Sequence, residues 1–337
     1  MDIILTEAGG PVGFHILESL ASHGLSVWIS DVSADGPAFS CGLAAGCFTT
    51  PHPQYDETGF IRTLKSKATE LGSCMLLPVF HPEIIARHRE EFPEGTLIPL
   101  DSLEKLLFLD NKCATSELAG KLGIRQPKTY TNPSEVKSYP IVFKRSEGLG
   151  GAGVYFPGNP GALEKLVAKA GRLSYLITDF IEGDDYSIDC IRWDGYFAAG
   201  AYKVLMPKRK GFSFSRVSVA EPELEAAARR ILEEVDYKGL CGMDFRRDKQ
   251  GRFWFLECNP RFSGGIHSQT ASGFDLPYLF WCLVTGASVP GYRFRAGVRT
   301  MSLSGARTYI ARRRAKRRLT FGEFLRCIPL PGTKVGK

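Results

Sequence analysis

The sequence has no run of apolar residues that approaches the roughly 20 needed to cross a bilayer. Its first residues, Asp2 to Thr6, have the pattern of a β-strand without the basic stretch of a signal peptide. The nine cysteines are scattered singly, without the paired spacing of a disulfide framework or a zinc site. These absences predict a cytoplasmic protein with reduced thiols and no membrane span.

A strong charge of one sign is also missing from most of the chain. The formal net charge is +7, and much of it lies in one short run, Arg312 to Arg318. That run contains no aromatic side chains on which nucleic-acid bases could stack. We therefore favour a solvated helix face over nucleic-acid binding, while an acidic partner or membrane phosphates stay as alternatives.

The 337 residues can form two or three domains. In the first third, expected strands alternate with expected helices, which is typical of a parallel sheet. The strands are expected at residues 3–5, 26–31, 74–79 and 96–99, and the helices at 14–23, 60–71 and 82–91.

The loop from Glu7 to Gly13 resembles a dinucleotide-binding turn, but Ala8 stands where the first glycine belongs. We therefore favour a turn that packs strand on helix over a nucleotide site. His52 and His81 follow strand-like runs, where ligands of open α/β sheets tend to bind. We interpret both as loop histidines in preference to catalytic ones.

Two apolar runs, residues 239–245 and 253–256, flank a turn that contains Gly251. They predict a β-hairpin. A four-residue turn would place Arg247 opposite Arg252.

In that register Asp244 faces Phe255, and Glu257 lies diagonally across from it. Because side chains alternate between the two faces of a strand, Asp244, Glu257 and Asn259 share one face, and Cys258 points to the other. Two carboxylates and an amide oxygen suit a hard cation such as Mg²⁺. The alternative is a pair of acidic residues on a solvated face, and a slip of one residue would move Asp244 to the wrong side.

The stretch Phe255-Leu-Glu-Cys-Asn-Pro-Arg261 resembles the metal-binding strand of the ATP-grasp superfamily, and most closely the branch that includes carbamoyl-phosphate synthase and biotin carboxylase. The resemblance covers residues 109–286 well and the first hundred in outline. It implies a fold that is α/β and α+β: a Rossmann-like (pre-ATP-grasp) domain at 1–108, a two-lobed ATP-grasp domain at 109–290 with a lid subdomain at about 124–182, and a C-terminal basic segment at 291–337.

Lys112 lies at the start of an expected helix that Asp110 caps and Gly123 ends. A cation there opposes the helix dipole unless an anion binds beside it. Farther on, a glycine-rich loop joins two expected strands, residues 139–144 and 154–156, whereas a P-loop would open a helix.

Such a loop resembles the lid of ATP-grasp proteins, in which backbone N–H groups close over phosphate oxygens. The resemblance implies cofactor contacts from Lys112, Lys144, Ser146, Gly150 and Gly151 at the phosphates, from Asp179, Phe180 and Ile181 at the adenine edge, and from Asp185 at the ribose, with Asp184 as a competitor. It implies metal ligation by Asp244, Glu257 and Asn259, and reaction contacts from Arg261, Lys203 and His267, of which His267 is equally well explained as a packing residue.

The resemblance implies an ATP-dependent ligase that joins a carboxylate to an amine through an acyl-phosphate and releases ADP and phosphate. The expected cofactors are ATP and Mg²⁺, with Mn²⁺ as an alternative. The expected partners are a small-molecule carboxylate and amine, and a homodimer stays open. The alternatives are a bicarbonate-using carboxylase or carbamoyl-phosphate-type enzyme, an NAD(P)-dependent oxidoreductase that uses the loop at residues 9–13, and a non-catalytic ATP-binding module.

Overall fold

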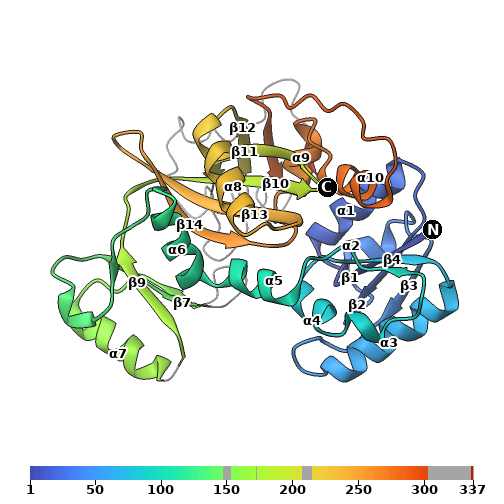
Figure 1. Ribbon diagram of the computed structural model, residues 1–337, viewed down its shortest axis with the longest axis horizontal. Helices are drawn as coiled ribbons and strands as arrows, with labels where there is room; N and C mark the ends of the chain where they lie inside the picture. The colour runs from blue at the N-terminus through green and yellow to red at the C-terminus, as the bar shows by residue number, and fades with distance from the viewer. Residues whose placement is uncertain (147–152, 172, 207–214, 303–334, 337) are drawn as a thin grey trace, which may run out of the picture.

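The computed structural model describes residues 1–146, 153–171, 173–206, 215–302 and 335–336. Figure 1 shows an N-terminal sheet covered by helices, a long central sheet, and a small lobe that carries α7 (Pro160–Ala170). The predictions for Gly150, Gly151 and the basic run 312–318 lie outside the described residues. Among the described helices, none combines the length and the apolar character that a membrane span requires.

The N-terminal sheet has five parallel strands in the order β3-β2-β1-β4-β5, which confirms the predicted parallel sheet. The chain builds outward from β1 in one direction and then in the other, so the strand order reverses between β1 and β4. Ligands of open parallel sheets bind outside the carboxyl ends of the strands at such a point. The elements are β1 (Asp2–Thr6), α1 (Pro11–Ser22), β2 (Val27–Asp31), α2 (Pro37–Ser40), β3 (Gly46–Thr49), α3 (Glu57–Leu71), β4 (Cys74–Pro78), α4 (Pro82–Arg87), the 3₁₀-helix η1 (Arg89–Glu91) and β5 (Thr96–Leu97).

The central sheet has seven strands in the order β14-β13-β10-β11-β12-β15-β16, all antiparallel except the last pair. Helix α8 buries its apolar side against β10 and β11, as its periodicity predicts. The elements are β10 (Gly183–Trp193), β11 (Tyr196–Met206), β12 (Ser215–Val219), α8 (Pro222–Glu234), β13 (Gly239–Asp248), β14 (Phe253–Asn259), α9 (Ile266–Ala271), α10 (Leu276–Thr285), β15 (Arg299–Ser302) and β16 (Val335–Gly336).

The small lobe is a four-stranded antiparallel sheet in the order β6-β9-β7-β8, with α7 packed on it. Two helices connect it to the N-terminal sheet and also lie against β14. The elements are α5 (Leu103–Asp110), α6 (Lys112–Lys121), β6 (Thr129–Tyr130), the 3₁₀-helix η2 (Pro133–Glu135), β7 (Ile141–Arg145), β8 (Val154–Tyr155) and β9 (Tyr175–Asp179).

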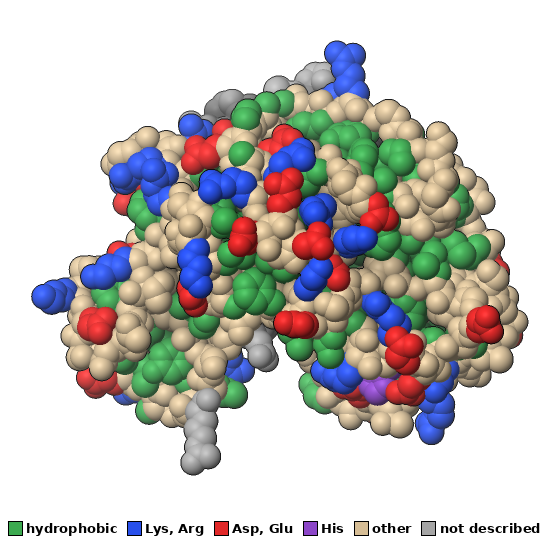
Figure 2. Space-filling view, in the orientation of Figure 1, with side chains coloured by type: hydrophobic (Ala, Val, Ile, Leu, Met, Phe, Trp, Pro, Cys, Tyr) green, Lys and Arg blue, Asp and Glu red, His purple; other side chains and the backbone are tan. Residues whose placement is uncertain are grey.

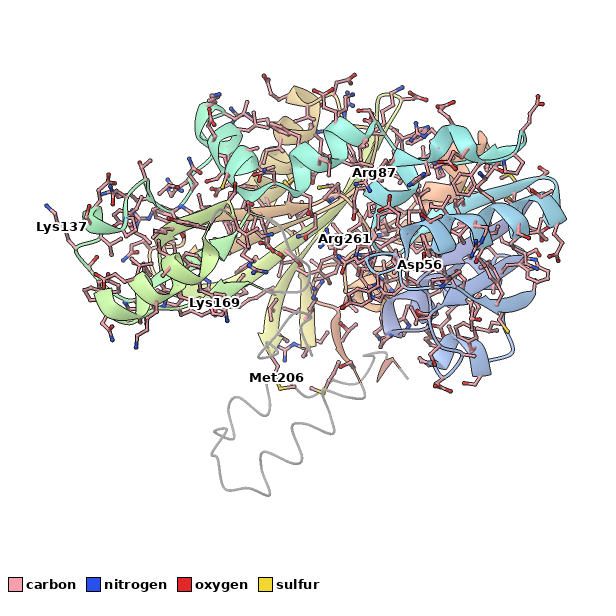
Figure 3. All side chains as sticks on the ribbon, turned by 90° about the horizontal axis from the view of Figure 1, so that it is seen from below. Asp56, Arg87, Lys137, Lys169, Met206 and Arg261 are labelled. Atoms are coloured by element: carbon pink, nitrogen blue, oxygen red, sulfur yellow. The ribbon has the colours of Figure 1, made fainter. Side chains whose placement is uncertain are left out.

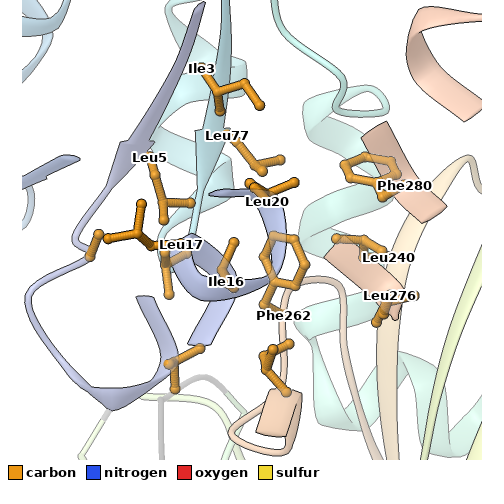
Figure 4. Packing of buried hydrophobic residues seen from close by; sticks show 14 of the residues in the cluster. Ile3, Leu5, Ile16, Leu17, Leu20, Leu77, Leu240, Phe262, Leu276 and Phe280 are labelled. Atoms are coloured by element: carbon orange, nitrogen blue, oxygen red, sulfur yellow. The ribbon is translucent and has the colours of Figure 1, made fainter. Parts of the chain in front are cut away.

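One apolar cluster joins the N-terminal sheet to the far end of the chain. Ile16 and Leu20 of α1 pack in it with Phe262, Leu276 and Phe280, all of which are almost fully buried (Figure 4). Because α1 and α10 share this core, the N-terminal sheet and the central sheet are held together by the same hydrophobic contacts.

We expect Leu276→Ala to lower the free energy of unfolding by about 2–5 kcal/mol, because the change leaves a cavity in this shared cluster. The matched control is Leu107→Ala on α5, where the leucine is 47% exposed and the loss should stay near 0.5 kcal/mol or less. Urea unfolding followed by tryptophan fluorescence measures both. A second transition that is unaffected by Leu276→Ala would contradict a common core.

Candidate nucleotide and metal site

The hairpin of β13 and β14 has a different register from the one predicted. Arg247 pairs with Phe253 and not with Arg252, and Asp244 pairs directly with Glu257. The register shifts at a β-bulge between Asp244 and Phe245, where β14 carries one extra residue. The sequence-based register was wrong because neither the bulge nor the length of the turn can be read from the residue pattern.

The bulge brings the two carboxylates closer than expected. Directly paired residues of an antiparallel ladder lie on the same face, so Asp244 and Glu257 are neighbours. Asn259 lies two residues farther along β14 and shares that face, while Cys258 is buried on the other. The predicted grouping of the three oxygen-bearing side chains is therefore present, and their binding of a metal stays a prediction.

The paired carboxylates disfavour one another's charge. Burial, followed by the charge of Glu257, raises the pKa of Asp244 to about 7, and Arg216 acts in the opposite direction. No cluster of three or more His, Cys, Asp or Glu side chains suited to a metal occurs within the described ranges. An ion held here would therefore need the amide of Asn259 and further oxygen ligands, such as those of phosphate groups.

Two lysines approach the carboxylates from different elements. Lys112 is the first residue of α6, and its Nζ lies 3.8 Å from Oε2 of Glu257. Lys144 comes from the small lobe, where its Nζ donates to the carbonyl of Leu256 at 3.2 Å. Burial lowers the pKa of Lys144, and the charge of Glu257 opposes that shift.

In Figure 2 the surface is hollowed between the lobe of α7 and the N-terminal sheet.

The start of α6 differs from the prediction in one respect. Asn111, not Asp110, is its N-cap, and its Oδ1 accepts hydrogen bonds from the backbone N–H groups of Cys113 and Ala114. Asp110 instead ends α5. The backbone N–H of Lys112 donates to the carbonyl of Ser146 at 3.2 Å, so the end of β7 and the start of α6 are adjacent as the predicted phosphate site requires.

The predicted adenine edge begins where β9 ends at Asp179. The carbonyl of Ile181 accepts a hydrogen bond from Nη1 of Arg246 at 3.1 Å, and the same guanidinium lies 5.2 Å from the centre of the Phe180 ring. Nε of Arg246 also donates to Oδ1 of Asp185 at 2.8 Å. Arg246 thereby fixes the segment that would carry adenine and ribose contacts.

Lys203 lies on the wrong face of the central sheet for the role predicted from the sequence. It pairs with Tyr186 in the β10–β11 ladder, whereas Ser187 pairs with Asp244, so Lys203 and Asp244 point to opposite sides. Its Nζ contacts Asp184 at 2.5 Å on that opposite face, whereas Asp185 lies on the face of Asp244. The prediction failed because the face of a basic residue depends on a strand register that the sequence does not give.

Arg216 of β12 lies on the same face of the central sheet as Asp244. The sequence analysis did not identify it. Its Nη1 lies 3.8 Å from Oδ2 of Asp189, a residue with 1% exposure. Burial raises the pKa of Asp189, and Arg216 opposes that shift. The alternation of side chains along β12 was the signal that could have identified Arg216.

Arg261 connects the candidate metal strand to the N-terminal side. Its Nη2 donates to Oδ1 of Asn259 at 2.7 Å, and its Nη1 donates to Oδ1 of Asp110 at 3.0 Å. Figure 3 shows Arg261 between the lobe that carries Lys169 and the N-terminal body that carries Asp56. Its predicted reach toward an anion beside the metal is compatible with this position.

Sequence comparisons agree with the geometry. Residues 173–305 match a family model described as ATP-grasp in the biosynthetic pathway with Ter operon. A stretch of 164 residues is 24% identical to a D-alanine–D-alanine ligase of Fusobacterium nucleatum. That match covers 44% of this chain and 55% of the ligase, so it spans about half of the relative's length.

Solved structures show the same fold. The biotin carboxylase domain of Hydrogenobacter thermophilus 2-oxoglutarate carboxylase superposes with a TM-score of 0.72 at 16% identity, covering 88% of this chain and 73% of that one. An L-amino acid ligase from Bacillus licheniformis gives 0.65 at 17%, covering 84% and 74%. N5-carboxyaminoimidazole synthetase from Staphylococcus aureus gives 0.68 at 17%, covering 87% and 79%.

The family match covers residues 173–305, and the solved structures share the fold over most of the chain. Beside the paired carboxylates lies a group of buried polar atoms. Oγ of Ser187, Oδ2 of Asp189 and Oε1 of Gln269 are buried without a hydrogen-bond partner among the described residues. Buried polar atoms of folded proteins normally have partners, so this group indicates a place for a polar ligand or ordered water.

Two glycines keep that place open. A Cβ at Gly265 would lie 2.1 Å from Nη1 of Arg216, and one at Gly242 would lie 3.2 Å from Oδ1 of Asp189. His267, the predicted proton shuttle, lies on α9 with its ring 5.0 Å from the His15 ring of α1. Its role in the reaction stays a prediction.

Removing the charge of Asp244 should stabilise the metal-free protein. We expect Asp244→Asn to raise the free energy of unfolding by about 1–2 kcal/mol at pH 8, a value discounted for the partial exposure of the carboxylate. Because the folded-state pKa of Asp244 is raised, the wild type loses stability as the pH rises from about 4 to 7.

The advantage of Asp244→Asn should therefore grow across that interval and level off above pH 7. Thermal unfolding in EDTA over a pH series measures it. The exposed Asp35→Asn serves as the control and should show no growing advantage. An equal effect of Asp244→Asn at every pH would contradict the mutual repulsion of the two carboxylates.

Proposed function

We propose that this protein is an ATP-grasp ligase that uses ATP to join a carboxylate to an amine. ATP phosphorylates the carboxylate, which gives an acyl-phosphate and ADP, and the amine then displaces phosphate. The observation that carries the proposal is the direct pairing of Asp244 with Glu257 beside Lys112 and Lys144. The activities printed for the relatives support it, including amino acid ligation.

The proposed arrangement follows the domains expected from the sequence: a Rossmann-like domain at residues 1–108 and an ATP-grasp domain at 109–290, with the lid at about 124–182. The parallel N-terminal sheet and the small lobe support these limits. The free thiols of the described cysteines support the proposed cytoplasmic location.

The carboxylate pair fits a divalent cation. The charge of Glu257 contributes to the raised pKa of Asp244, and a bound cation would reduce the repulsion between the two carboxylates. Asn259 adds a neutral oxygen ligand. Asp244, Glu257 and Asn259 would hold Mg²⁺, which supplies neutralisation of phosphate charge. A relative of the same fold was crystallised with MgADP and bicarbonate, which supports the assignment of a nucleotide to this place.

The cationic side chains have separate tasks in the proposed reaction. Lys112 of α6 and Lys144 of β7 stabilise the negative charge of the transferring phosphoryl group. Arg261 is held by Asn259 and Asp110, and it presents a fixed charge beside the same oxygens. Arg216 lies beside the buried polar atoms of Asp189 and Gln269, where it orients the carboxylate substrate.

The loop at Glu7–Gly13 does not favour the oxidoreductase alternative. In dinucleotide-binding folds an acid at the end of the second strand accepts the ribose hydroxyl. Here Oδ2 of Asp31 accepts the backbone N–H of Gly9 at 2.7 Å, so this carboxylate stabilises the loop itself.

An ADP-release screen over pooled carboxylates and amines tests the function. The wild type is expected to release ADP with Mg·ATP only when both pools are present. Glu257→Gln should reduce that release by about 100-fold, because it removes a metal-binding charge. The control is Glu182→Gln, whose side chain is 73% exposed and contacts Lys249.

Normal ADP release by Glu257→Gln would remove the metal assignment. Release with carboxylates and bicarbonate alone would favour the carboxylase alternative, and nucleotide binding without any release would favour a binding module.

A second comparison separates Arg216 from Lys203. Arg216→Gln is expected to lower ADP release by about tenfold to 100-fold, because it removes a charged hydrogen-bond donor from the substrate side. Lys203→Gln should stay within about twofold of the wild type, since its exposed pair with Asp184 lies on the opposite face. The reverse order would mean that the substrate binds on the other side of the sheet.

A further inference from the structure

A second group of buried polar atoms lies at the carboxyl edge of the N-terminal sheet. Oγ1 of Thr6, Oε2 of Glu7, Oγ of Ser30, Oγ1 of Thr50 and Nε2 of His81 have no hydrogen-bond partner among the described residues. They come from the ends of β1 and β2 or from the segments that follow β1, β3 and β4. Several buried polar atoms without hydrogen-bond partners indicate a polar ligand or ordered water at this edge.

The group lies where the strand order reverses. Glu7 directly follows β1, and His81 follows β4, the two adjacent strands at which the sheet changes direction. Both residues have left-handed backbone conformations, with φ of 55° at Glu7 and 46° at His81. Left-handed backbone is uncommon for side-chain-bearing residues and tends to occur at functional sites.

Glu7 and His81 form a hydrogen-bonded pair that is more than nine-tenths buried. Nδ1 of His81 lies 2.6 Å from Oε1 of Glu7. A carboxylate accepts only, so Nδ1–H donates and the neutral ring keeps a lone pair on Nε2. The two atoms without partners, Nε2 of His81 and Oε2 of Glu7, are then both acceptors. Two adjacent acceptors match the N–H donors of an amine or ammonium group.

The charges around His81 suit a proton acceptor. Burial lowers the pKa of His81, but the hydrogen bond and charge of Glu7 outweigh it, and the net shift is upward. Glu83 adds to the rise, and Arg261 opposes it. The His52 ring lies 6.2 Å away, centre to centre. Arg261 also binds Asn259 of the candidate metal strand, so this edge lies within electrostatic reach of the proposed reaction centre.

We propose that this edge binds the amine substrate and that His81 accepts its proton. The inference rests on the proposed ligase function and deepens it. The amine nitrogen bonds to the carbonyl carbon of the acyl-phosphate, and the bond from that carbon to the phosphate oxygen breaks. The electron pair leaves with phosphate, and the proton lost by the nitrogen passes to Nε2 of His81. Glu7 orients the imidazole and is a positioning residue.

ADP release driven by the twenty pooled L-amino acids, which supply both carboxylates and amines, tests the role of the pair. His81→Gln and Glu7→Gln should lower that release at least tenfold near neutral pH. Added hydroxylamine should restore most of it, because this nucleophile is unprotonated there and needs no base. His88→Gln is the matched control, since His88 also contacts two glutamates but lies on the surface of the same body.

The pH profile separates a role in proton transfer from a structural one. The wild-type rate should rise with pH through the pKa of His81. In Glu7→Gln that rise should move to lower pH, because Glu7 holds the pKa of His81 up. Unchanged profiles in both variants, or equal losses with and without hydroxylamine, would overturn the proposal while leaving the ligase function intact.

A binding measurement decides on the site even if no ADP is released. In the full chain labelled with ¹⁵N-histidine, ammonium chloride should shift the Nε2 resonance of His81, identified by its absence in His81→Gln. Tetramethylammonium chloride, which has no N–H donor, should not. Equal responses to both salts would mean that ordered water alone occupies the edge, and the amine site would be rejected. Failure of the pooled screen in the wild type would count against the ligase function alone.

Discussion

The structure depends on one unfavourable contact, the direct pairing of Asp244 with Glu257 across two strands. Like charges in a cross-strand pair destabilise a sheet, and burial of Asp244 adds to the cost. Lys112 and Lys144 compensate only in part, because Lys112 lies 3.8 Å away and Lys144 is itself desolvated. In the proposed site, a cation bound by phosphate groups would remove the remaining repulsion, so the contact that weakens the empty fold would favour the liganded one.

The surrounding elements position the two carboxylates and place cationic side chains beside them. The bulge in β14 aligns the carboxylates, and the small lobe delivers Lys144 to the backbone of the same strand. On one side Arg216 supplies a positive charge beside the buried polar atoms near Asp189. On the other side Arg261 leads toward the Glu7–His81 pair. Two groups of buried polar atoms, which have no hydrogen-bond partners among the described residues, thus lie near the candidate metal site. Two such groups fit a reaction between two different substrates.

The sequence predicted the elements better than their contacts. The alternation of expected strands and helices in the first hundred residues predicted the parallel sheet. The apolar runs 239–245 and 253–256 predicted the hairpin and the shared face of its oxygen-bearing side chains. The predictions of the hairpin register, of the N-cap of α6 and of the role of Lys203 were wrong. The register depends on a bulge, and the face of Lys203 depends on a pairing between strands. Arg216 and the Glu7–His81 pair were missed as functional groups for the same reason: their partners lie 27 and 74 residues away in the chain.

The most direct test of the account is an anomalous difference map from crystals of the protein grown with Mn²⁺ and ADP. The account predicts a manganese peak bounded by the side-chain oxygens of Asp244, Glu257 and Asn259, with the nucleotide phosphates beside Lys112 and Lys144. Manganese elsewhere, or ADP seated on the loop between Glu7 and Gly13, would contradict it.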